Sequence, residues 1–183
     1  MITPGQGILL IADPFLKDPN FKRSVVLLCR HSEEGSFGFV LNKIYEHTLG
    51  DLISGLEDCK LPVYNGGPVQ MDTVHYIHQY HDLLPDSQLI AKNIYWGGDF
   101  EILKKLIKNK SVNPALIKFF IGYSGWGNGQ LENELSDKSW LTATSNRNIV
   151  FDTALEEIWK AGLKHLGGKY EMMINFPIDP QLN

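Results

Sequence analysis

The residues with the clearest chemical potential lie in one glycine-rich stretch, residues 122–134. An apolar run that ends at Ile121 predicts a buried strand, which leads into a turn with four glycines and then into a short segment with helical spacing. Four polar side chains gather around this turn: Ser124, Asn128, Gln130 and Glu132. Polar groups on a tight loop of a rigid scaffold are typical of a functional site, and also of a difficult chain reversal.

Ser124 is a candidate nucleophile. Gly122 and Ser124 match the hydrolase pattern Gly-x-Ser-x-Gly, but Trp126 stands where the second glycine should be. A catalytic triad also needs a histidine and a carboxylate nearby, and the only histidine after Ser124 is His165. The alternative is that the Ser124 hydroxyl bonds to backbone within the turn. A hydrolase that uses Ser124 is therefore kept as an alternative hypothesis.

The segment 125–130 could also form a nest of backbone N–H groups that binds an anion such as phosphate. The segment lacks the lysine and the spacing of a P-loop. Glu132 and Glu134 would oppose an anion if they faced it. Glycines in such turns more often serve the geometry of the chain.

Two further positions join this stretch in the predicted binding surface. Arg23 could hold a carboxylate or phosphate of a partner bidentately, or it could pair internally with Asp18 or Asp13 and pin its loop. Gly66 and Gly67 belong to a strong turn signal. The predicted ligand- or partner-binding residues are Arg23, Gly66, Gly67, Ser124, Trp126, Gln130 and Glu132.

Three histidines, His75, His78 and His81, recur at every third position and raise the question of a metal site. In a strand, His75 and His78 would point to opposite faces, so they could not share a metal ion. The chain has no His-Glu-x-x-His or Cys-x-x-Cys motif. The sequence predicts no metal site and no cofactor.

Composition limits the class of protein. A chain of 183 residues with 43% hydrophobic and 21% charged residues suits one soluble domain, which we expect to span residues 1–183. The net charge of −4 argues against direct nucleic-acid binding. Cys29 and Cys59 form no disulfide framework, and the sequence shows neither a signal peptide nor a membrane span. We therefore expect a cytoplasmic protein that does not contact a membrane.

Hydrophobic patterning predicts more strands than helices. Strands are expected at 7–12, 25–30, 37–42, 62–64, 73–79, within 88–95, at 115–123 and at 140–144, with an extended piece at 149–151. Helices are expected at 48–56, at 99–110 and, from a capping box at Thr153 and Glu156, up to Gly167. This pattern predicts one α+β domain whose sheet is mostly antiparallel or mixed, either open or barrel-like, flanked by a few helices.

Four sequence blocks, each weak alone, form a specific ordered set that covers nearly the whole chain. They are residues 7–14 with 18–26, His31 with 38–42, residues 66–69, and residues 122–126 leading to 130–134. In order and spacing this set resembles the YqgE/AlgH family of bacterial proteins. The resemblance implies a single cytoplasmic α+β domain and a regulatory role, as the family's transcriptional-regulator namesake suggests, and it implies no cofactor, catalytic residue or reaction.

These observations favour a non-enzymatic binding or regulatory protein that contacts another protein or a small ligand. The motivation is the resemblance together with the incomplete catalytic constellation around Ser124. The alternatives are the Ser124 hydrolase and a regulator that binds DNA directly, which would bind duplex DNA with a steep dependence on salt.

Overall fold

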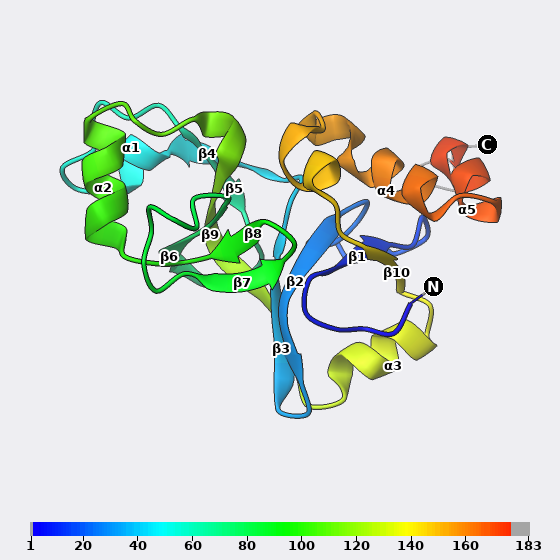
Figure 1. The fold of residues 1–183 in the computed structure, drawn as a ribbon. Coiled ribbons are helices and arrows are strands. Elements are labelled where there is room, and N and C mark those ends of the chain that lie inside the picture. The colour runs from blue at the N-terminus through cyan, green and yellow to red at the C-terminus, as the bar shows by residue number, and fades with distance from the viewer. Residues whose placement is uncertain (1, 177–183) are drawn as a thin grey trace.

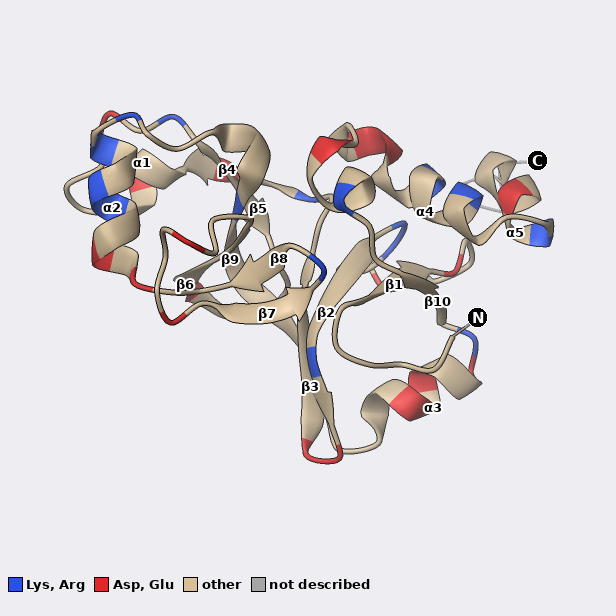
Figure 2. Ribbon diagram, viewed as in Figure 1, with Lys and Arg blue, Asp and Glu red and all other residues tan. Residues whose placement is uncertain are grey.

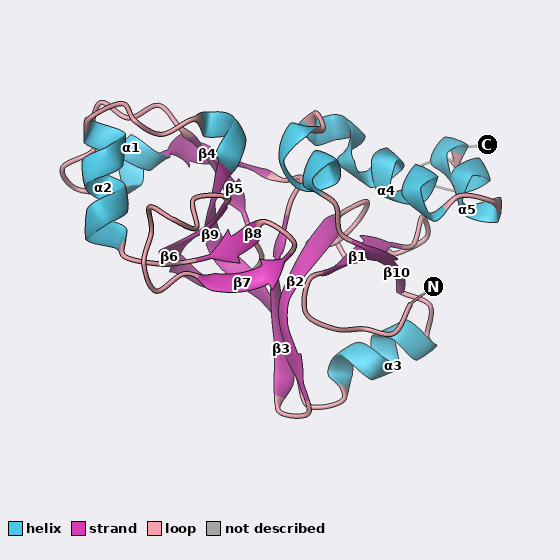
Figure 3. Cartoon of the chain, viewed as in Figure 1, coloured by secondary structure: helices cyan, strands magenta, loops and turns pink. Residues whose placement is uncertain are grey.

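The computed structural model describes residues 2–176 (Figure 1). The strands are β1 (Ile8–Ala12), β2 (Val25–Ser32), β3 (Gly35–Val40), β4 (Ile44–Thr48), β5 (Pro62–Asn65), β6 (Val69–His78), β7 (Gln88–Ala91), β8 (Ile94–Trp96), β9 (Ile117–Gly127) and β10 (Trp140–Thr144). The α-helices are α1 (Leu49–Leu52), α2 (Phe100–Lys108), α3 (Gln130–Ser136), α4 (Ile158–Leu166) and α5 (Lys169–Met172). Figure 3 shows the helices arranged around the strands.

The strands of the described residues form one sheet in the order β10-β1-β2-β3-β9-β6-β8-β7, while β5 joins β9 and carries β4. The pairings are antiparallel apart from the parallel pair of β5 and β9. The sheet curls into a half-barrel, so Leu9 of β1 and Ile94 of β8 share one core cluster although their strands are far apart in the order. The predicted α+β class, with a mixed and barrel-like sheet flanked by helices, is confirmed.

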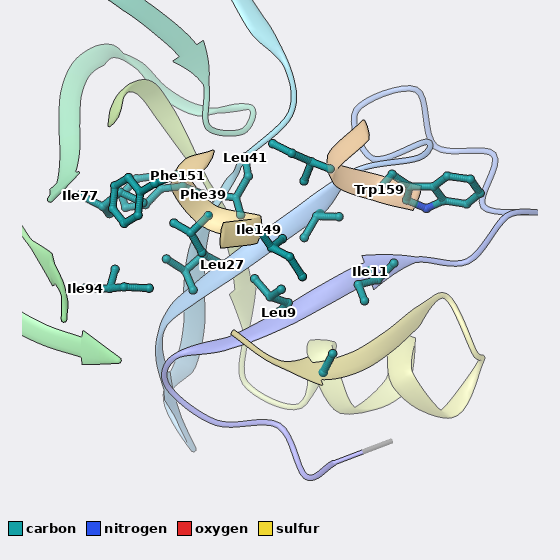
Figure 4. Packing of buried hydrophobic residues seen from close by; sticks show 14 of the residues in the cluster. Leu9, Ile11, Leu27, Phe39, Leu41, Ile77, Ile94, Ile149, Phe151 and Trp159 are labelled. Atoms are coloured by element: carbon teal, nitrogen blue, oxygen red, sulfur yellow. The ribbon is translucent and has the colours of Figure 1, made fainter. Parts of the chain in front are cut away.

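Helices and loops cover the sheet on both faces, because its strands carry apolar side chains on both. The inner cluster includes Leu27, Phe39 and Ile149, and is closed by Trp159 of α4 (Figure 4). A second cluster lies on the other face of β1, β2 and β3, against Leu131 of α3. A third packs α1 and α2 against β5, β6 and β9. Residues 25–29 of β2 are all buried, as the continuous apolar run predicts for a central strand.

Three local predictions were wrong. The helix expected at 48–56 ends at Leu52. It is preceded by an exposed edge strand, β4, which was not predicted because its sequence is polar. The piece expected to be extended at 149–151 is a wide helical turn, Asn148–Asp152, in which the Asn146 side chain accepts from Ile149 N. The expected capping box at Thr153 is absent, because the Thr153 hydroxyl donates to Asn148 O and α4 begins at Ile158.

Other predictions at this level were confirmed. Asp99 caps α2 by accepting from Ile102 N at 3.0 Å, and Gly167 ends α4 with φ 68°. The segment 88–95 holds parts of two short strands, β7 and β8. Pro177 and Pro180 predict an irregular tail over residues 175–183, of which residues 177–183 lie outside the described residues.

Candidate functional site

The glycine-rich stretch is largely strand, and the prediction of a turn with four glycines was wrong. Strand β9 continues to Gly127, and Gly125 and Gly127 pair with Phe37 and Gly35 of β3. Gly122, at φ 66°, allows this continuation, because a Cβ atom there would lie 2.6 Å from Gly67 O. The chain reverses only at residues 128–129, where Gly129 adopts φ 69° and starts α3.

Ser124 meets the Gly66–Gly67 turn, so the structure brings together three of the predicted residues. The side chain of Ser124 is fully buried, and its Oγ donates to Gly66 O at 3.0 Å. Gly67 lies so close that a Cβ atom would be 2.4 Å from Ser124 Oγ. The hydroxyl therefore fastens one turn to β9, and this geometry gives no support to a nucleophilic Ser124.

Trp126 and Gln130 converge on one carboxylate on the α3 side of the sheet. Glu134 Oε2 accepts from the indole N–H groups of Trp126 and Trp140, each at 2.8 Å. Glu134 Oε1 accepts from Gln130 Nε2 at 2.9 Å, and Gln130 Oε1 accepts from Gly127 N at 3.1 Å. The Gly127 N–H is therefore already bonded to Gln130. It is not free to bind an anion, as the predicted nest of N–H groups at 125–130 would require.

Glu132 lies on the same side but faces the β2–β3 hairpin. Its Oε1 is 3.6 Å from His31 Nε2, and the Glu132 side chain is 51% exposed. His31 Nδ1 is 2.7 Å from Ser36 Oγ, so the imidazole bridges α3 and β3. This contact joins α3 to the hairpin at the surface.

Arg23 lies apart from these residues and has a backbone φ of 50°. Its guanidinium stacks on Trp159, with Cζ 4.7 Å from the ring centroid, and donates to Phe176 O. The internal pairing that sequence suggested was wrong, because Asp13 and Asp18 instead accept from backbone N–H groups two residues downstream. Arg23 borders a separate pocket of 370 Å³, lined also by Asn42, Glu156 and Lys160.

An aromatic groove lies along β3 and β9, and Trp126 connects it to the Glu134 network. Phe37 pairs with Arg30 of β2, whereas the next pair, His31 with Ser36, faces α3. The groove has a volume of 510 Å³, within the range of small-ligand pockets. Its lining residues are Arg30, Glu34, Gly35, Ser36, Phe37, Val69, His75, Trp96, Tyr123, Gly125 and Trp126.

Ring contacts hold this aromatic groove in shape. The Phe37 ring meets the Trp96 ring edge-on with centroids 4.9 Å apart, and meets the Tyr123 ring at 5.9 Å. His75 is edge-on to Tyr123 at 6.0 Å. These four rings come from β3, β6, β8 and β9, so only the curled sheet can bring them together.

Three charged or polar groups give the aromatic groove its electrostatic character. Arg30 is exposed, and its Cζ lies 5.6 Å from the centroid of the Phe37 ring. His75 Nε2 is buried and has no hydrogen-bond partner among the described residues. Burial lowers the pKa of His75 below its ordinary value of 6.5, so the imidazole is neutral at neutral pH. Glu34 lies at the tip of the β2–β3 hairpin and is exposed.

Of the predicted binding residues, Trp126 lines this groove, whereas the sequence did not predict Phe37, Trp96 or Arg30 as part of the site. Tyr123 and Trp126 belong to the sequence block 122–134, and the sequence suggested His75 only as a possible metal ligand. His75 and His78 do face opposite sides of β6, as predicted: His75 packs on Phe39, whereas His78 contacts Tyr76 and Tyr80. Within residues 2–176, no cluster of three or more potential ligand residues could hold a metal ion.

Comparison with known proteins agrees with this architecture. The sequence model of a family described as AlgH-like matches residues 9–171. A "UPF0301 protein" of Chlorobium limicola is 45% identical over 97% of this chain and 95% of its own length. A protein of the same name from Cytophaga hutchinsonii is 42% identical over the full length of both chains.

Two solved structures have the same fold. The solution structure of AlgH from Pseudomonas aeruginosa superposes with a TM-score of 0.73 at 28% identity, covering 97% of each chain. A crystal structure of a protein from Corynebacterium diphtheriae gives a TM-score of 0.78 at 22% identity, covering 96% of this chain and 94% of that one. The chain belongs to the AlgH/YqgE family. Among the helices described, none combines the length and the apolar character that crossing a bilayer requires.

Proposed function

We propose that this protein is a non-enzymatic, cytoplasmic binding protein with a regulatory role, and that it acts through the aromatic groove. The observation that carries the proposal is the meeting of four rings, Phe37, His75, Trp96 and Tyr123, around one open volume of 510 Å³. Trp and Tyr rings supply much contact area for little loss of conformational entropy. An exposed groove rich in them suits a bound partner or ligand.

Of the residues predicted from sequence, Trp126 lines the aromatic groove, and several others support the groove from behind. Ser124, Gly66 and Gly67 fasten β9 to a neighbouring turn, and Gln130 and Trp126 connect it to α3. Because β9 also presents Tyr123 and Gly125 to the groove, these contacts fix the position of its wall. Arg23 and Glu132 keep their proposed roles as further partner contacts, each outside this groove.

The alternatives lack a supporting observation in the described residues. A hydrolase would need an accessible Ser124 hydroxyl, but it is buried and bonded to a backbone carbonyl. Direct DNA binding would need a basic surface. Figure 2 shows the Lys and Arg of α2, α4 and α5 with acidic residues near them, and the net charge is −4.

A comparison of two neighbouring residues on β8 tests the proposal. Trp96 lines the aromatic groove, while Tyr95 stacks on His81 away from it. We expect Trp96→Ala to lose partners captured from the host lysate, or metabolites detected by thermal shift, that wild type and Tyr95→Ala retain. The binding loss should be tenfold or more, as for an aromatic residue central to an interface.

Arg30→Glu provides a second groove variant, because Arg30 is exposed and its replacement should leave the fold intact. Near-ultraviolet circular dichroism would confirm the fold of each variant. If Trp96→Ala and Arg30→Glu both bind as wild type does, the aromatic groove is not the contact surface and the proposal fails.

A further inference from the structure

The side chains that line the aromatic groove limit the class of ligand that it can bind. This inference rests on the proposed function. We propose that the groove binds a planar aromatic ring that carries an anionic group, such as a carboxylate, sulfonate or phosphate. The ring lies among the side chains of Phe37, Trp96 and Tyr123. The anionic group meets the guanidinium of Arg30.

The preference for a ring follows from the geometry of the wall. Phe37 stands edge-on to both Trp96 and Tyr123, with interplanar angles of 62° and 76°. Rings at such angles expose faces and edges to the space between them, and a further aromatic ring gains by stacking or edge contact with them.

The preference for an anion follows from Arg30. Clusters of aromatic rings often bind cations, but here the Arg30 guanidinium already lies 5.6 Å from the Phe37 centroid. A second cation in the groove would meet this charge, whereas a carboxylate or phosphate can accept two parallel N–H donors from it. Glu34 carries the opposite charge at the hairpin tip, so the anionic group is expected at Arg30 and away from the tip.

A matched pair of fluorescent probes separates the ring from the charge. 1-Anilinonaphthalene-8-sulfonate carries an anionic sulfonate, and N-phenyl-1-naphthylamine has the same rings without it. We expect wild type to bind the sulfonate probe more tightly. Arg30→Gln should weaken binding of the sulfonate probe about tenfold and leave binding of the neutral probe unchanged, since only the sulfonate accepts a charge-assisted hydrogen bond from Arg30. Trp96→Ala should lower the affinity for both probes.

Lys105→Gln is the matched control, because it removes one exposed positive charge on α2, outside the groove lining. It should leave both affinities unchanged. Equal affinity for the two probes, or an Arg30→Gln variant that binds the sulfonate probe normally, would overturn the preference for an anion. The proposed function would survive that result as long as Trp96→Ala weakens both probes. If Trp96→Ala changes neither affinity, the probes do not bind in the groove and this inference fails, whereas the proposed function is decided separately by the binding comparison of Trp96→Ala with Tyr95→Ala.

Discussion

At the scale of single residues, Glu134 connects several side chains of the glycine-rich stretch, residues 122–134, to the core. Its carboxylate accepts from Trp126, Trp140 and Gln130. Trp126 and Trp140 are 5% and 1% exposed, so their indole N–H groups have little access to water. A buried donor that loses its acceptor costs free energy, because it had to give up hydration to enter the core. Trp126, Gln130 and Glu134 therefore stabilise the fold by joining β9, α3 and β10.

Replacement of Glu134 tests this role. We expect Glu134→Ala to lower the free energy of unfolding by about 3 kcal/mol, because two buried donors then lack an acceptor. Glu134→Gln should lower it by only about 1 kcal/mol, since its amide oxygen can still accept. Urea unfolding measures both values. An alanine variant as stable as the glutamine variant would show that the carboxylate does not hold these indoles.

At the scale of elements, β9 is the strand on which the two halves of the molecule depend. It pairs with β3, β5 and β6, and its side chains contribute to all three core clusters. Ile121 faces the α1 and α2 cluster, while Tyr123 two positions later faces the inner cluster. Strict alternation would place both on one face. Gly122, at φ 66°, makes this change of face possible.

Two glycines of the same strand provide a matched comparison. Gly122→Ala should cost about 2 kcal/mol or more, because its φ is positive and a Cβ atom would lie 2.6 Å from Gly67 O. Gly127→Ala should change stability by less than about 0.5 kcal/mol, since Gly127 has no atom within 4 Å of an added Cβ. Thermal and urea unfolding of the two variants measure the difference. Equal effects would contradict the role given to Gly122.

At the scale of the whole molecule, the curled sheet buries histidines that must stay neutral. His78 is fully buried, its Nε2 donates to Gly97 O at 2.8 Å, and its Nδ1 accepts from Tyr80 N at 3.0 Å. Burial lowers the pKa of both His75 and His78 below 6.5, although the Gly97 carbonyl partly opposes this for His78. The unfolded chain therefore binds protons at a pH where the folded chain does not.

This difference in proton binding sets the direction of a pH effect. Because the unfolded state takes up protons first, the free energy of unfolding should be highest above the ordinary histidine pKa of 6.5 and should fall as the pH drops below it. Urea unfolding at pH 7 and pH 5 measures the loss. His78→Asn should reduce the loss, because asparagine does not titrate and can still accept from Tyr80 N. His47→Asn, at an exposed position, is the control. Equal losses in the two variants would contradict this role of His78.

The sequence predicted most elements, because their causes are local. Continuous apolar runs such as 25–29 are buried strands in any packing, and Asp99 caps α2 through a bond to a residue three positions on. The errors occurred where distant contacts override local pattern. The polar edge strand β4 forms because it pairs with β5, and the glycine-rich stretch stays extended because it pairs with β3.

By itself the sequence determined the family and the α+β class, because ordered motifs and hydrophobic periodicity can be recognised without coordinates. Only the tertiary structure decided which face each residue occupies. Ser124 turns toward the buried side of β9, Tyr123 turns into the aromatic groove, and Trp126 both lines the groove and bonds to Glu134. The groove needs rings from four strands that only a curled sheet brings together. The physical reason is that strand pairing and curl arise from contacts between distant residues, whereas motifs and periods are properties of neighbours.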